Sequence, residues 1–156
     1  MTAFSRTILL PSPPDDVWAA VLRPALMVHI ARPLAVMSLS GGAPWPDEWA
    51  PGEHRVDVRL FGFLPVGWQV IGIHLLPEEN GVRRAEDRGY SPLIRRWHHV
   101  IEVAPAEAGG TRYTDRLDID AGLLTPFVSL FARTLFAHRQ RRLRRLAEAG
   151  FDFTRT

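Results

Sequence analysis

Cysteine and lysine are both absent from the sequence, in which all 19 basic residues are arginine. Without cysteine the chain has no disulfide, thiolate metal site, iron–sulfur cluster or cysteine nucleophile. Without lysine it has no Schiff-base chemistry and no P-loop lysine. It also lacks the Gly-x-Ser-x-Gly turn of serine hydrolases and any apolar run near the roughly 18 residues of a membrane span. The start shows no secretory signal, so we expect a cytoplasmic protein.

The composition is that of an ordinary globular domain. The 156 residues are 46% hydrophobic and 23% charged, with a net charge of +2, which predicts a single domain over residues 1–156. Five basic residues cluster near the C-terminus: Arg139, Arg141, Arg142, Arg144 and Arg145. Cations near the C-terminal end of a helix are favoured by its dipole. We therefore interpret this cluster as a solvent-exposed face, and expect neither a nucleic-acid partner nor integral membrane association.

The first third of the sequence predicts one strand and two short helices. Residues 5–10 form the strand, and a proline-rich segment ends it. Two aspartates then suit the first turn of a helix, and Pro24 separates this helix from a second one over residues 25–30. The loop that follows is rich in glycine and proline and contains Trp45 and Trp49. We interpret these two side chains as a lid that packs over the interior.

From Glu53 onward apolar and polar residues alternate, which is typical of half-buried strands. The pattern predicts an antiparallel meander of five strands, over residues 53–60, 67–76, 82–89, 94–103 and 112–120. After Gly122 the spacing becomes helical for about 25 residues, and Gly150 suits the C-cap. The first half of this helix is apolar nearly all round, which predicts deep burial.

A sheet with one polar face must cover its other face. The elements long enough to do so are the C-terminal helix and the pair of short helices. We therefore predict an α+β fold, in which a curved antiparallel sheet of six or seven strands wraps around a long C-terminal helix that starts near Leu123. The two short helices follow the first strand. A lipocalin barrel is disfavoured, because it would not use a quarter of its chain for an amphipathic helix.

Five local strings appear in a recognisable order: Ser-Pro-Pro-Asp-Asp-Val-Trp (12–18), Phe-Gly-Phe-Leu-Pro-Val-Gly-Trp (61–68), Arg-Trp-His-His (96–99), Gly-Gly-Thr-Arg-Tyr-Thr-Asp-Arg (109–116) and His-Arg-Gln-Arg-Arg-Leu (138–143). Together they resemble the SRPBCC superfamily, the helix-grip fold of START lipid-transfer domains, birch-pollen-type allergens and polyketide cyclases. The resemblance implies a helix-grip fold with a ligand-binding or cyclase-like role. Ile101 stands where the similar subgroup often has a second histidine, so a role for a histidine pair does not carry over.

Strand alternation places one polar side chain from each of three neighbouring strands on the inner face of the sheet. Asp87, His99 and Asp115 each share that face with apolar residues two positions away. If both hairpin loops are symmetric, His99 lies opposite both carboxylates, with Cβ atoms about 5 Å apart. The sequence therefore predicts an Asp–His–Asp row in the interior.

Three interpretations of this row remain open. The carboxylates satisfy a buried histidine, or the row anchors a ligand in a mostly apolar pocket, or it performs general acid–base chemistry with an imidazole whose pKa the carboxylates raise. A metal site is the weakest idea, because nothing in the sequence fixes an open coordination position. We expect no metal and no cofactor.

Two functions follow from these observations. The first is binding or transport of a hydrophobic small molecule, such as a lipid, quinone or polyketide, in a cavity between sheet and helix. The second is an enzyme of the polyketide cyclase/aromatase type, in which His99, Asp115 and Asp87 move protons. The predicted ligand-binding residues are Val58, Trp68, Trp97, His99, Ile101, Tyr113, Asp115, Leu117, Phe127 and Phe131.

Overall fold

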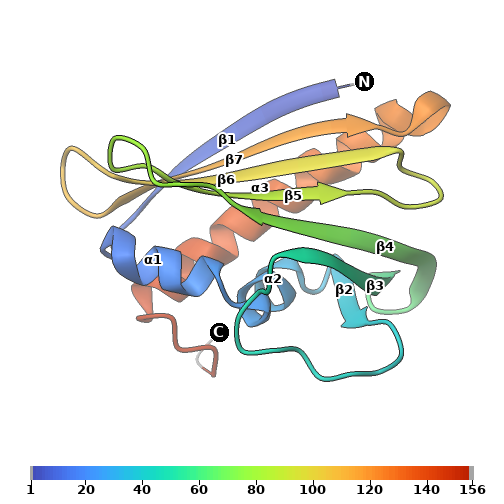
Figure 1. Cartoon of the computed structure of the whole chain (residues 1–156), viewed down its shortest axis with the longest axis horizontal. Helices are drawn as coiled ribbons and strands as arrows, with labels where there is room; N and C mark the ends of the chain where they lie inside the picture. The colour runs from blue at the N-terminus through green and yellow to red at the C-terminus, as the bar shows by residue number, and fades with distance from the viewer. Residues whose placement is uncertain (1, 155–156) are drawn as a thin grey trace.

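A computed structural model describes residues 2–154 of the chain (Figure 1). The strands are β1 (Thr2–Leu10), β2 (Ala35–Leu39), β3 (Gly52–Leu60), β4 (Leu64–Leu75), β5 (Arg83–Gly89), β6 (Arg96–Pro105) and β7 (Thr111–Asp120). The helices are α1 (Pro14–Val21), α2 (Pro24–Ala31) and α3 (Thr125–Glu148), with a short 3₁₀ turn, η1 (Gly122–Leu124), before α3. The predicted fold class is confirmed, including the two short helices after the first strand.

The strands form one antiparallel sheet in the order β1-β7-β6-β5-β4-β3-β2. Strands β3 to β7 are the predicted meander. The last strand, β7, lies beside β1 and pairs with it along the whole length of β1. Strand β2 was not among the predicted strands; it pairs with β3 from Ala35–Leu60 to Leu39–Val56. With only five residues, β2 is too short to show a clear alternation, and its pairing with β3 defines it.

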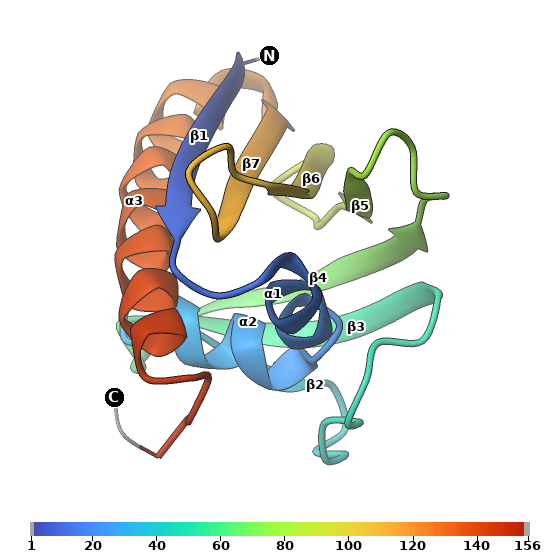
Figure 2. The ribbon, with the colours of Figure 1, turned by 90° about the vertical axis from the view of Figure 1, so that its left-hand side faces the viewer.

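The sheet changes direction where β4 meets β5. Figure 2 shows β3 and β4 running beneath β5 and β6 at a steep angle. Two glycines let the backbones come close here: a Cβ atom at Gly72 would lie 2.6 Å from the Arg88 carbonyl oxygen, and one at Gly89 would lie 2.8 Å from that of Val70. No side chain fits at such distances, so glycine is required at this joint. The bend turns the inner faces of the two halves of the sheet towards a common interior.

The long helix α3 lies along the inner side of the sheet (Figures 1 and 2). Its C-terminal half contributes Leu143 and Leu146 to a core cluster with Val17 and Val21 of α1. The prediction that its first half is deeply buried is wrong, because Phe127 is 73% exposed. The all-round apolar pattern there forms an apolar surface at the end of the helix, beside the cavity described below. Among residues 2–154 no helix is long and apolar enough to cross a membrane.

Candidate functional site

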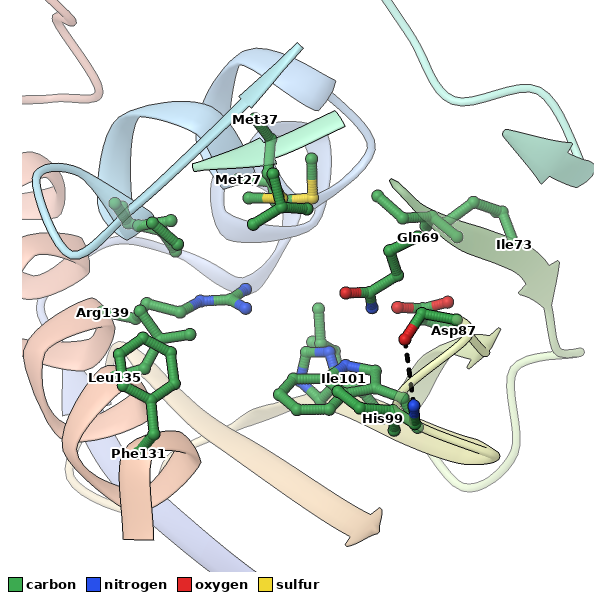
Figure 3. A pocket seen from close by; sticks show the side chains of 18 of the residues that line it. Met27, Met37, Gln69, Ile73, Asp87, His99, Ile101, Phe131, Leu135 and Arg139 are labelled. Carbon is green, nitrogen blue, oxygen red and sulfur yellow. Dashed lines mark hydrogen bonds between the residues drawn. The ribbon is translucent and has the colours of Figure 1, made fainter. Parts of the chain in front are cut away.

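A cavity of about 450 Å³ lies between the inner face of the sheet, α2 and α3. Its wall is mostly apolar, and Figure 3 shows side chains converging on it from the sheet, α2 and α3. Of the predicted ligand-binding residues, those that border it are Val58, Trp68, Trp97, His99, Ile101, Tyr113, Phe127 and Phe131. Their contact with a ligand stays a prediction, but the structure brings them together around one space.

Two predicted residues lie behind the wall. Leu117 packs with Phe136 and Ile119 in a separate core cluster, and Asp115, only 2% exposed, is covered by its hydrogen-bond partners. Neither borders the cavity, because the helix α3 packs directly against this part of β7.

Trp68 borders the cavity, and it also has a partner on the outer side of the sheet. Trp68 pairs with Asp57 across the β3–β4 ladder, which places both side chains on the outer face of the sheet. There the guanidinium of Arg55 lies 4.4 Å from the centroid of the Trp68 ring. Whether Trp68 contacts a ligand stays a prediction.

The predicted polar row is correct on one side and shifted on the other. His99 lies opposite Asp87, as predicted, whereas it lies opposite Leu117 and not Asp115. The β6–β7 turn spans residues 106–110, with the Ala106 N–H donating to the Gly110 carbonyl, so the centre of the hairpin is one residue later than a symmetric reading gives. Even so, His99 reaches diagonally to Asp115, with 2.8 Å between Nε2 and Oδ1.

Asp115 accepts three hydrogen bonds in the interior. His99 Nε2 and the Tyr113 hydroxyl donate to Oδ1 at 2.8 and 3.1 Å, and Gln140 Nε2 of α3 donates to Oδ2 at 2.9 Å. Burial alone would raise the pKa of this carboxyl, but the hydrogen bond from His99, the Arg139 charge and the bond from Gln140 hold it below its usual value. The carboxylate is therefore ionised and fixed in place at neutral pH.

His99 is neutral at pH 7. Its side chain is buried, and burial lowers the pKa of the imidazole below its usual value despite the hydrogen bond to Asp115. In the neutral form Nε2–H donates to Asp115, and the ring meets Phe136 edge-on at 4.8 Å between centroids. Burial thus outweighs the carboxylate, which is the opposite of what an imidazole with a raised pKa requires.

Asp87 faces the cavity from β5. One of its oxygens, Oδ1, accepts a hydrogen bond from the Gly72 N–H at 2.9 Å. Burial raises the pKa of Asp87 to about 7, against the opposing effects of that hydrogen bond and of the Arg139 charge. The surface that Asp87 keeps exposed borders the cavity. Asp87 is therefore a carboxyl group that changes its charge near neutral pH inside an apolar space.

Sequence reasoning missed Arg139 as a cavity residue. The cluster that contains it was interpreted as a solvent-exposed face, but Arg139 is buried and borders the cavity. Figure 3 shows its side chain pointing from α3 into the cavity, towards Gln69 and Asp87 on the other side. A signal was present: Arg139 lies four residues from both Leu135 and Leu143, on the same stripe of the helix.

The cavity reaches the surface between the β5–β6 loop and the start of α3. Leu93 and Phe127 border the cavity and are 54% and 73% exposed. Trp49 also borders the cavity, and Trp45 packs against it with ring centroids 5.9 Å apart. The lid interpretation of the two tryptophans stays a prediction. Among residues 2–154 no group of three or more histidine and acidic residues is arranged to hold a metal ion.

Known proteins resemble the chain at two levels. A family model described as Domain of unknown function (DUF8410) matches residues 8–147. No curated protein matches the chain. Similar solved structures include protein CV1439 from Chromobacterium violaceum, which is 16% identical with a TM-score of 0.66, over 95% of this chain and 99% of that one.

Two further solved structures carry more informative names. A START superfamily protein from Mycobacterium smegmatis is 15% identical, with a TM-score of 0.60 over 94% of this chain and 97% of that one. The Zhui aromatase/cyclase from Streptomyces sp. R1128 is 12% identical, with a TM-score of 0.60 over 94% of this chain and 93% of that one. Identities this low show the fold alone. They confirm the predicted helix-grip fold.

Proposed function

The chain belongs to the DUF8410 family of domains, and we propose that it binds or carries a hydrophobic small molecule, such as a lipid, quinone or polyketide, in the cavity between the sheet and α3. The observation that carries this proposal is the cavity itself. Its volume of about 450 Å³ lies within the roughly 300–1,000 Å³ of small-molecule sites. The proposal includes the cytoplasmic location expected from the sequence.

The wall chemistry supports an apolar occupant. Met27 and Met37 face the cavity from α2 and β2, and Ile73 borders it from β4 (Figure 3). Methionine side chains are flexible and adapt to ligands of irregular shape. The exposed Leu93 and Phe127 give such a ligand an apolar path to the interior. The structural neighbours named START superfamily protein and aromatase/cyclase have the same fold, which fits a cavity-based function.

The direct test is native mass spectrometry of protein purified from its own host. A retained molecule would identify the ligand class. A complementary test is isothermal titration with a hydrophobic probe, comparing Ile101→Trp with Val100→Trp. Ile101 borders the cavity, whereas its neighbour Val100 lies opposite Glu86 and Arg116 on the other face of the sheet.

We expect the tryptophan at position 101 to fill part of the cavity and weaken probe binding about tenfold or more. The tryptophan at position 100 should leave binding unchanged. Equal effects of the two variants, or no binding of any apolar probe to the wild-type protein, would contradict the proposal.

A second candidate is an enzyme of the cyclase/aromatase type. The observation that favours it is Asp87, whose pKa of about 7 is suited to taking up and releasing a proton at neutral pH. Asp87 lies opposite His99 in the sheet and borders the cavity. In this function the cavity would fold a reactive poly-carbonyl chain, and Asp87 would remove a proton from it.

The two functions are separated by Asp87→Asn. With a poly-β-carbonyl substrate, an enzyme should lose turnover by about a hundredfold or more while binding stays nearly intact. A binding protein should show no turnover in either form. Turnover that the substitution does not change would remove Asp87 from the reaction.

A further inference from the structure

Arg139 lies inside the protein, where an arginine needs a partner. The residue is 9% exposed and borders the cavity. Its guanidinium carbon lies 4.5 Å from the centroid of the Phe136 ring, which supports one face of the planar group. Figure 3 shows the side chain extending from α3 into the cavity. The position is fixed by packing, not by a charged neighbour.

Within the part of the chain that the structure describes, no carboxylate forms an ion pair with Arg139, and its Nε atom is buried without a hydrogen-bond partner. Asp115 and Asp87 interact with the positive charge of Arg139 only at longer range. The oxygens of Asp115 accept hydrogen bonds from His99, Tyr113 and Gln140 instead. By contrast, Arg144 in the same helix pairs with Glu148 at 3.2 Å. A buried guanidinium without a partner is costly, so a ligand that supplies an acceptor gains affinity.

We propose, building on the proposed binding function, that the ligand is an apolar monocarboxylic acid whose carboxylate binds Arg139. A guanidinium presents two parallel N–H donors that match the two oxygens of a carboxylate. One cation suits one negative charge. A phosphate group, which carries more charge, would call for more cations than this wall provides. The apolar remainder of the wall holds the body of the molecule.

The opposite side of the cavity completes the head-group site. Gln69 and Asp87 point towards Arg139 across the cavity (Figure 3). The Gln69 amide has N–H donors for a carboxylate oxygen. Asp87, with its pKa raised to about 7 by burial, is protonated in slightly acidic solution and then donates its O–H. Beyond this polar end, Phe131 and Leu135 of α3 contact the apolar body.

The test compares two probes that differ at one end, dodecanoic acid and 1-dodecanol. Both are titrated calorimetrically into the intact protein below their aggregation concentrations, in slightly acidic buffer. The wild-type protein should bind the acid about 10- to 100-fold more tightly, the range expected for hydrogen bonds to a charged group. Arg139→Met should abolish this preference while still binding the alcohol. Arg139→Lys should keep part of the preference, because lysine keeps the positive charge but lacks the two parallel N–H donors of the guanidinium.

Arg141→Met is the matched control, since Arg141 is exposed on the same helix and should not affect either probe. Equal binding of acid and alcohol by the wild-type protein overturns this inference but leaves the proposed binding function standing. A preference that survives Arg139→Met also overturns it. If neither probe binds, the binding function fails and this inference fails with it. If Arg139→Met does not fold, the comparison of acid and alcohol binding in the wild-type protein and in Arg139→Lys tests the inference.

Discussion

Asp87 and Asp115 are two carboxyl groups on the same face of one sheet, and their environments shift their pKa values in opposite directions. Asp115 accepts hydrogen bonds from three side chains, which keep it ionised against the effect of burial. Asp87 accepts one, from the Gly72 N–H, and burial raises its pKa to about 7. The number of donors therefore decides which carboxyl stays charged and fixed and which one can exchange a proton.

Asp87→Asn should stabilise the protein at alkaline pH. The folded state holds the Asp87 proton up to about pH 7, whereas the unfolded chain loses it near pH 4, so stability falls as pH rises through this window. Asparagine stays neutral and can still accept the Gly72 hydrogen bond. We expect its advantage in the free energy of unfolding to grow by roughly 2–3 kcal/mol between about pH 5 and pH 8.

Urea denaturation of both proteins at the two pH values measures this change. Asp47→Asn, in an exposed loop, is the control and should show no such growth. An advantage for Asp87→Asn that is the same at both pH values would mean that Asp87 is ionised throughout.

Asp115→Asn should destabilise the protein at neutral pH. The new N–H₂ group would face the Gln140 amide N–H₂, and Gln140 cannot rotate freely because the same nitrogen donates to the Arg6 carbonyl at 3.0 Å. One buried donor is left without an acceptor, which costs roughly 2–4 kcal/mol.

Thermal unfolding should show Tm lower by about 5–15 °C for Asp115→Asn. Glu148→Gln, which breaks an exposed pair with Arg144, should change Tm by no more than about 2 °C. A similar Tm for both variants would show that the Asp115 cluster adds little to stability.

The positions of His99 and Asp115 along their strands were sufficient to place them on the inner face, because successive side chains of a strand point to opposite faces of the sheet. It could not reveal Arg139. Within a run of arginines, the residue that lies on the buried stripe looks like its solvent-exposed neighbours, and the spacing to Leu135 and Leu143 is the one sign that separates it. The pKa of Asp87 was also beyond reach, because it depends on how tightly the bend at Gly72 encloses the carboxyl group.

At the level of elements, the β6–β7 turn shows how closely the end of β1 is packed. Gly109 and Gly110 both have positive φ, at 91° and 77°. A Cβ atom at Gly110 would lie 2.3 Å from the Leu10 carbonyl oxygen, whereas one at Gly109 would have no neighbour within 4 Å. The two positions therefore share the cost of backbone strain but differ in the space around them.

Gly110→Ala should be much more destabilising than Gly109→Ala. Alanine at 109 should cost about 1 kcal/mol for the left-handed conformation alone. At 110 the backbone of β1 must move as well, which should add roughly 2 kcal/mol or more. Urea denaturation of both variants measures the difference, and equal values would mean that the end of β1 moves away freely.

Element types were easier to predict from the sequence than pairing. The five strands of the meander carry a clear alternation, but the register of β6 on β7 depends on which residues the turn uses, and this placed His99 opposite Leu117. The first half of α3 was expected in the core because its apolar residues surround the helix. Phe127, which is exposed and borders the cavity, shows that such a pattern also arises at the mouth of a cavity.

At the scale of the whole molecule, the cavity wall joins distant parts of the chain. Residues of α2, of the strands from β3 to β7 and of α3 all border it, and β1 closes the sheet by pairing with β7. Loss of any one of these elements opens the interior that the others share. We therefore propose that residues 1–156 act as a single folding unit, with the cavity as part of its core.

This arrangement predicts one cooperative unfolding transition that a ligand moves as a whole. Far-UV circular dichroism and tryptophan fluorescence should report the same Tm, because the five tryptophans lie in α1, in the β2–β3 loop, in β4 and in β6. Dodecanoic acid at about 100 times its Kd should stabilise the folded state by about 2.7 kcal/mol. It should raise the Tm reported by both signals by roughly 5–10 °C. With Arg139→Met the same concentration of acid should give a clearly smaller shift, since binding is weaker. Two separate transitions, or a shift in only one signal, would mean that the helix and the bent sheet unfold independently and that the cavity does not couple them.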